Sequence, residues 1–175
     1  MMRAAADAFG VAYPDGVVAE LSVSNADKGV LPVEEVARRV SAYRDAQETG
    51  ALVLPGLAVT QEPFFLQKAR LFPGAAFVVG YDTAIRILDK KYTDNDADKL
   101  LDSLVEMLQL GVRIGVAGRA DKDGTYKTLA HALEERGADV PNVVLSRLFV
   151  GVDNERVDVS STSLREQEVA RGERT

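Results

Sequence analysis

The sequence contains no cysteine and only one histidine, and both shortages limit the chemistry that the chain can perform. Without cysteine there is no disulfide, no thiolate metal site and no thiol nucleophile. The one histidine, His131, has no second histidine or cysteine near it in the sequence. We therefore interpret His131 as a structural residue rather than as a metal ligand.

Long hydrophobic runs are also absent. None approaches the roughly 20 apolar residues that a membrane-spanning helix requires, and the opening segment MMRAAADAFG lacks the apolar centre of a signal peptide. The net charge of -6 argues against binding to nucleic acid or to an anionic membrane. These absences predict a cytoplasmic protein that has neither kind of partner.

The remaining composition is that of one folded domain. The chain has 175 residues, of which 46% are hydrophobic and 27% charged. This length is sufficient for a single domain over residues 1–175 with a full hydrophobic core.

Strand-like and helix-like segments alternate along the chain. Short apolar segments predict strands at 16–24, 51–56, 75–79, 112–118 and 143–151. Apolar residues at helical spacing predict helices at 3–9, 32–50, 63–72, 82–92, 96–111, 127–137 and 160–172. Thr60 is the expected cap of the third of these helices. The alternation predicts an α/β fold, with a parallel sheet and helices on both of its faces.

Polar clusters follow four of the predicted strands. Asn25–Lys28 follows the first strand, Gly80–Asp82 the third, Gly118–Gly124 the fourth and Ser160–Thr162 the last. Parallel α/β sheets bind ligands beyond the carboxyl ends of their strands. We therefore expect these clusters to lie at one edge of the sheet and to form a binding site.

Four residues of the first three clusters are candidate nucleotide-binding residues, and each has a structural alternative. The ammonium of Lys28 could meet a phosphate, or its segment could be only a turn. Gly80 would let a ligand approach the backbone closely. Asp82 could accept a hydrogen bond from a ribose hydroxyl or cap the next helix. Arg119 could bind a phosphate or be a solvated surface residue.

The last cluster, in the stretch DVSSTSLRE, has the most specific pattern. Ser160, Ser161 and Thr162 begin the final predicted helix, and Arg165 lies almost one turn later on the same face. Ser160 or Ser161 could simply cap the helix. A helix N-terminus with extra hydroxyl donors and an arginine also suits the phosphates of a nucleoside triphosphate.

Together, these segments resemble the nucleotidylyltransferases of the nicotinamide mononucleotide adenylyltransferase type, and most of all their cytidylyltransferase-like branch. The similarity covers nearly the whole chain, in the order ELSVSNADKGVLPVEEVARRV, KARLFPGAAFVVGYDTAIRILDKKY, VAGR and DVSSTSLRE. The stretch SSTSLR is similar to the C-terminal signature of that family.

The resemblance implies a Rossmann-like sheet that binds ATP or CTP together with a small phosphorylated acceptor, such as nicotinamide or nicotinate mononucleotide. In the implied reaction a phosphate ester attacks the α-phosphorus and pyrophosphate leaves, with Mg²⁺ held largely through the phosphates. The hydroxyls of the signature and Arg165 would hold the phosphates. Gly80 and Asp82 match the segment that lines the nucleotide pocket in the family.

The chain departs from the family at one point. The family has a first strand, a glycine-rich turn and a motif of two histidines that stabilises charge on the transferring phosphate, and none of these is found here. We therefore expect a domain without one central strand, through a late gene start or a truncation, that is inactive in isolation and self-associates. The alternatives are a non-catalytic nucleotide-binding or interaction protein of the same fold, and a purely structural α/β domain.

Overall fold

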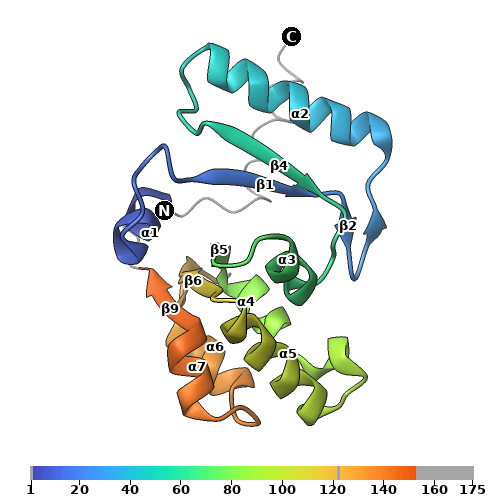
Figure 1. Cartoon of the computed structure of the whole chain (residues 1–175), viewed down its shortest axis with the longest axis vertical. Helices are drawn as coiled ribbons and strands as arrows, with labels where there is room; N and C mark the ends of the chain where they lie inside the picture. The colour runs from blue at the N-terminus through green and yellow to red at the C-terminus, as the bar shows by residue number, and fades with distance from the viewer. Residues whose placement is uncertain (1, 122, 153–175) are drawn as a thin grey trace.

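The structure is a computed structural model, and it describes residues 2–121 and 123–152 (Figure 1). These residues form a mixed α/β protein whose longer strands all pair in parallel. The predicted α/β class is therefore confirmed. Among the described residues, no helix is both long enough and apolar enough to cross a membrane.

The parallel strands form two separate groups. Strand β1 (Val18–Ser22) pairs with β4 (Gly56–Thr60). Strands β5 (Ala76–Gly80), β6 (Arg113–Ala117) and β9 (Phe149–Val152) form a sheet in that order. Within the described part of the chain, no backbone ladder joins β1 to β5.

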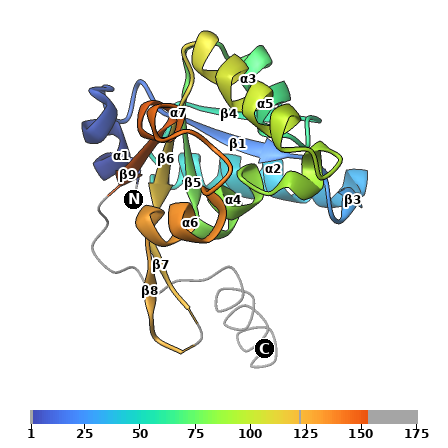
Figure 2. The same ribbon diagram turned by 90° about the horizontal axis from the view of Figure 1, so that it is seen from below.

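Besides these strands, the described residues form seven α-helices, one short 3₁₀ helix and two small hairpins. The helices are α1 (Met2–Phe9), α2 (Val33–Glu48), α3 (Phe65–Leu71), α4 (Tyr81–Ile87), α5 (Ala97–Gln109), α6 (Leu129–Arg136) and α7 (Asn142–Leu148). The hairpins, which the sequence analysis did not predict, pair β2 (Ser24–Asn25) with β3 (Gly29–Val30) and β7 (Arg119–Ala120) with β8 (Tyr126–Lys127). Figure 2 shows the β7–β8 hairpin projecting away from the sheet.

The main hydrophobic core surrounds the β5–β6–β9 sheet. Helix α5 packs against both α3 and α7, α4 packs against α6, and the two groups lie on opposite sides of the sheet (Figure 2). Helix α5 contributes the buried stripe Leu100, Leu104 and Met107, which recurs at helical spacing. Ile114 and Val116 of β6 are fully buried because this central strand is covered on both faces.

The group of β1, β4 and α2 is packed much less tightly. Helix α2 and strand β1 have no buried residue, and β4 has only Thr60. Polar contacts hold α2 in place: the Tyr43 hydroxyl donates to the Gly56 carbonyl at 2.7 Å, and the Gln47 amide donates to the Leu54 carbonyl at 2.6 Å. We expect this group to open more readily than the main core.

The strand predicted at 51–56 is wrong. Strand β4 begins only at Gly56, directly after Pro55, and continues to Thr60. Pro55 has no N–H to donate to a ladder, so a strand of this sheet starts after it. Leu54, in the preceding segment, is buried at 2% exposure and has a carbonyl bound by α2. Since Thr60 ends β4, it does not cap α3, whose N-cap residue is Phe64.

The strand predicted at 143–151 is wrong over most of its length. Helix α7 occupies Asn142–Leu148, and only the end of the segment forms β9. Pro141 stands at the N-cap position, and proline is well tolerated at a helix start. Val144, Leu145 and Leu148 are buried with the spacing of one helical face. Tertiary burial therefore overrides the β-propensity of the two valines.

The helix predicted at 82–92 is divided into two pieces. Helix α4 ends at Ile87, and a short 3₁₀ helix, η1, follows at Lys90–Thr93. The Asp89 side chain accepts a hydrogen bond from the Lys91 backbone N–H at 3.0 Å and so starts the second piece separately.

Candidate functional site

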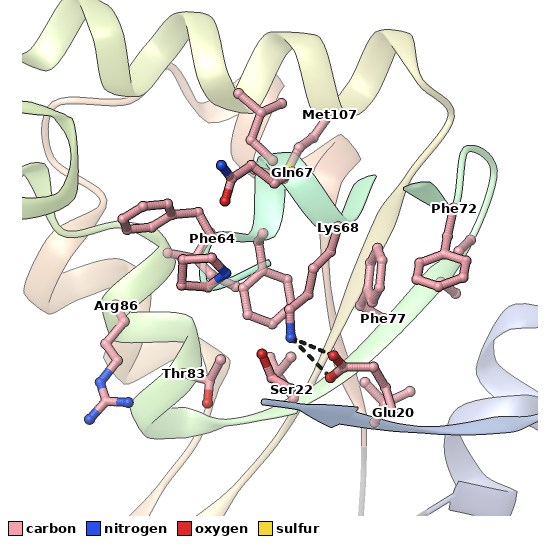
Figure 3. A pocket seen from close by; sticks show the side chains of 18 of the residues that line it. Glu20, Ser22, Phe64, Gln67, Lys68, Phe72, Phe77, Thr83, Arg86 and Met107 are labelled. Carbon is pink, nitrogen blue, oxygen red and sulfur yellow. Dashed lines mark hydrogen bonds and ion pairs between the residues drawn. The ribbon is translucent and has the colours of Figure 1, made fainter. Parts of the chain in front are cut away.

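A cavity of about 1120 Å³ separates the two groups of parallel strands. Its walls include residues of β1 and β5, of helices α1, α3, α4 and α5, and of the β2–β3 turn. Figure 3 shows β1 along its lower side and side chains of α3 and α5 above. Residues of both strands line this cavity, and no ladder joins them within the described part of the chain.

Aromatic side chains form much of the cavity wall. Phe77 of β5 meets the rings of Phe65 and Phe72 edge to face, at centroid distances of 5.7 and 6.4 Å. Gln67 of α3 also lines the cavity (Figure 3), and its buried Oε1 has no hydrogen-bond partner among the described residues. A buried acceptor of this kind is satisfied by a bound donor or by water.

A charged pair of side chains, Lys68 and Glu20, lies in the wall of this cavity. The Lys68 ammonium donates to both carboxylate oxygens of Glu20, each at 2.9 Å (Figure 3). The Thr60 hydroxyl donates to the same carboxylate. The side chain of Lys68 is only 6% exposed and that of Glu20 is 28% exposed. The carboxylate therefore supplies the counter-charge that a buried ammonium at the cavity wall requires.

We predict that loss of the carboxylate of this buried pair destabilises the protein much more than loss of a carboxylate from an exposed pair. Glu20→Ala leaves the Lys68 ammonium buried without a counter-charge, and we expect it to lower the free energy of unfolding by about 3–5 kcal/mol. Urea unfolding followed by circular dichroism measures the change. Glu106→Ala is the matched control, because its partner Arg70 is exposed, and it should leave the midpoint nearly unchanged. Equal effects of the two mutations would contradict a specific role of the buried pair.

Gly80 lies at the carboxyl end of β5 and lines the cavity. A Cβ at this position would meet no described atom within 4 Å, so the backbone is open on this side. Gly80 is also the N-cap residue of α4, and no side chain caps this helix. The alternative that Asp82 caps α4 is therefore wrong.

Asp82 and Arg119 are brought together at the carboxyl ends of β5 and β6. The Arg119 guanidinium donates to the Asp82 carboxylate, and both side chains are about half exposed. Gly118 precedes Arg119, and a Cβ there would lie 2.6 Å from the Tyr126 ring. Only glycine fits this close approach, which fixes the start of the β7–β8 hairpin and hence the position of Arg119.

Lys28 lies in the exposed turn between β2 and β3. The Asn25 side chain accepts hydrogen bonds from the backbone N–H groups of Asp27 at 2.9 Å and Lys28 at 3.1 Å. This geometry confirms that the segment is a turn closed by its asparagine. Contact between Lys28 and a phosphate stays a prediction.

Asp27, in the same turn, accepts hydrogen bonds from two side chains and forms an ion pair with a third, and no local sequence pattern predicted these contacts. Lys91 donates at 2.8 Å, the Tyr92 hydroxyl donates at 2.7 Å, and the Arg86 Nε lies 3.5 Å away. The hydrogen bond from Lys91, and then that from Tyr92, lower the pKa of the Asp27 carboxyl below its usual value. Asp27, Arg86 and Tyr92 all line the cavity.

His131 has a structural role, as the sequence analysis predicts. It forms a reciprocal cap with Thr128 at the start of α6, where its Nδ1 accepts from the Thr128 backbone N–H at 3.2 Å. Tyr81 is also engaged, because its hydroxyl donates to Glu135 at 2.7 Å. This hydrogen bond, together with burial, raises the pKa of Tyr81 to about 12.

The four residues of the C-terminal signature, Ser160, Ser161, Thr162 and Arg165, lie outside the described residues. Within residues 2–121 and 123–152, no group of three or more histidine or acidic side chains could hold a metal ion. Comparison with known proteins gives no match to a protein-family profile, to a curated protein or to a solved structure.

Proposed function

We propose that this protein is a nucleotide-binding domain of the nucleotidylyltransferase type. The observation that carries the proposal is the meeting of Gly80, Asp82 and Arg119 beyond the carboxyl ends of the adjacent strands β5 and β6. Ligands of parallel α/β sheets bind at this edge. A nucleotide needs three features there: backbone that it can approach closely, a carboxylate that accepts a hydrogen bond from a ribose hydroxyl, and a cation that donates hydrogen bonds to a phosphate.

In this proposal each residue has a separate task. The Asp82 carboxylate accepts from a ribose hydroxyl, and the Arg119 guanidinium contacts a phosphate while it remains paired with Asp82. The signature hydroxyls of Ser160, Ser161 and Thr162 and the Arg165 guanidinium hold the rest of the triphosphate. These residues position the α-phosphorus for attack by the phosphate ester of an acceptor, with loss of pyrophosphate.

The Mg²⁺ of this proposal would bind through phosphate oxygens. The described residues offer no cluster of three acidic or histidine side chains for it, and Mg²⁺ commonly uses few protein ligands when phosphates are present. The ion would supply charge neutralisation on the leaving pyrophosphate.

Arg165→Ala tests the proposal at the signature. We expect it to weaken binding of ATP or CTP, in the presence of Mg²⁺, by about 1–3 kcal/mol, because a charge-assisted hydrogen bond to phosphate is lost. Isothermal titration calorimetry of the parent and the variant measures the difference. Arg171→Ala is the matched control in the same predicted helix and should bind as the parent does. Equal affinity of the parent and Arg165→Ala would remove Arg165 from the site.

A non-catalytic nucleotide-binding or interaction protein of the same fold is the second candidate. It is favoured by the sequence itself, which has one histidine in place of the pair that catalysis requires. This candidate shares the expected nucleotide binding and differs only in turnover. Calorimetry therefore tests what the two have in common, and a pyrophosphate assay separates them.

A further inference from the structure

The donors around Asp27 have the arrangement of an anion-binding site that is already filled. An ammonium, a guanidinium and a phenol converge on one carboxylate from Lys91, Arg86 and Tyr92. Arg86 and Lys91 carry two positive charges against the one negative charge of Asp27. The two basic side chains are 47% and 62% exposed, so solutes can reach them.

The three donors belong to α4 and η1, which are anchored by contacts that do not involve Asp27. Helix α4, which carries Arg86, is anchored in the core by the fully buried Ala84. The η1 turn is fixed by the Thr93 hydroxyl, which donates to the Asp96 carbonyl at 3.0 Å, and the Tyr92 ring packs against Phe64 at 6.1 Å. The backbone that carries the three donors is therefore held independently of the carboxylate.

The Asp27 carboxylate belongs to a hairpin that few contacts stabilise. The β2–β3 hairpin has only two ladder pairs, and residues 25–30 are all exposed. Its turn reverses at Gly29, which has a φ of +75°. Movement of this hairpin would break few buried contacts, so displacement of Asp27 has a low structural cost.

We propose that Arg86, Lys91 and Tyr92 form a binding site for a phosphate monoester, and that Asp27 is a tethered carboxylate that occupies this site until the ligand displaces it. A phosphate dianion carries more charge than a carboxylate and offers three terminal oxygens to the three donors. Since Asp27 belongs to the β2–β3 hairpin at the cavity rim, binding at this site also releases the hairpin from α4 and η1. This site does not rest on nucleotide binding, because none of its four residues has a role in the nucleotide contacts of the proposed function.

Asp27→Asn tests the proposal with inorganic phosphate as the probe. The substitution removes the competing negative charge, and we expect phosphate to bind about tenfold more tightly than to the parent, from the loss of one charge-assisted interaction. Titration calorimetry at constant ionic strength, with chloride as the reference anion, measures the affinity. Asp94→Asn is the matched control, because it breaks an exposed ion pair with Lys99 and changes the net charge equally. Asparagine also suits the positive φ of Asp94.

A second variant locates the bound phosphate. Lys91→Met in the Asp27→Asn background should return the affinity to that of the parent or lower. The proposal is overturned if Asp27→Asn binds phosphate no more tightly than the parent, if Asp94→Asn gains equally, or if Lys91→Met has no effect. Melting curves check that each variant folds. Unfolding of both Asp27→Asn and Asp27→Ala would make Asp27 a structural residue and would also overturn the proposal.

Discussion

A chain extended at Met1 by an apolar strand, a glycine-rich turn and a histidine pair should melt at least about 10 °C above the 175-residue chain. We expect the added strand to occupy the cavity between β1 and β5, pair with both and bury its side chains against α3 and α5. Five or so buried residues and their hydrogen bonds would contribute several kcal/mol, enough for a shift of this size.

The backbone of both flanking strands has hydrogen-bonding groups that point toward the cavity. Val23, just after β1, donates to the Thr60 carbonyl, and Arg113 of β6 donates to the Ala75 carbonyl. Because backbone groups alternate in direction along a strand, those of Glu20 and Val78 face away from their ladders. Open edges of this kind invite pairing with other chains, so the 175-residue chain should self-associate.

Amide hydrogen exchange locates the added strand. In the 175-residue chain the amides of Glu20 and Val78 should exchange faster than those of Leu21 and Val79, which face their ladders. In the extended chain all four should be protected. An extension with proline at alternate strand positions is the control, because proline cannot donate to a ladder. Equal melting temperatures and a monomeric 175-residue chain would mean that its sheet is complete without another strand.

The 175-residue chain should release no measurable pyrophosphate from ATP or CTP with Mg²⁺ and nicotinamide or nicotinate mononucleotide. Its one histidine is committed to capping α6, and the described residues hold no other histidine. A donor that stabilises charge in a transition state contributes about 10²–10³-fold to the rate. Loss of two such groups therefore puts turnover below the detection limit of a coupled pyrophosphate assay.

The histidine-bearing extension is the positive counterpart of this experiment. It should restore turnover, whereas the same extension with both histidines replaced by alanine should raise the melting temperature without activity. Robust turnover by the 175-residue chain would contradict the expectation. Lys28→Met and Arg119→Met would then show which of these cations does the work of the histidines.

Local sequence signals correctly predicted the elements whose hydrophobic pattern matches the burial of their residues in the structure. Strand β6 lies in an apolar segment bounded by Gly111 and Gly118, and α5 begins directly after Asp96, whose side chain caps it. The sequence pattern gave a wrong prediction where tertiary contacts determine the secondary structure. In α7, two valines that favour a strand lie in a helix that packs on the core. The pattern also failed at Pro55, which shifts the start of β4.

The candidate site was predicted only in part, because the sequence shows which residues end a strand but not which distant residues contact each other. The rule that ligands bind at the carboxyl ends of parallel strands selected Gly80, Asp82 and Arg119, and the structure pairs the last two. The pair of Glu20 and Lys68 joins residues 48 positions apart, and no local pattern reveals such a partner. The donors around Asp27 are similarly distant, since 64 positions separate Asp27 from Lys91.

Nucleotide binding at the carboxyl edge of β5 and β6 is tested most directly by amide chemical shifts. The ¹⁵N-labelled chain would be titrated with ATP and with CTP in the presence of Mg²⁺. We expect saturable shifts of the amides of Gly80, Asp82 and Arg119 with at least one of the two nucleotides. Shifts confined to the segment from Arg86 to Tyr92, or no saturable shift at any of the three amides, would contradict it.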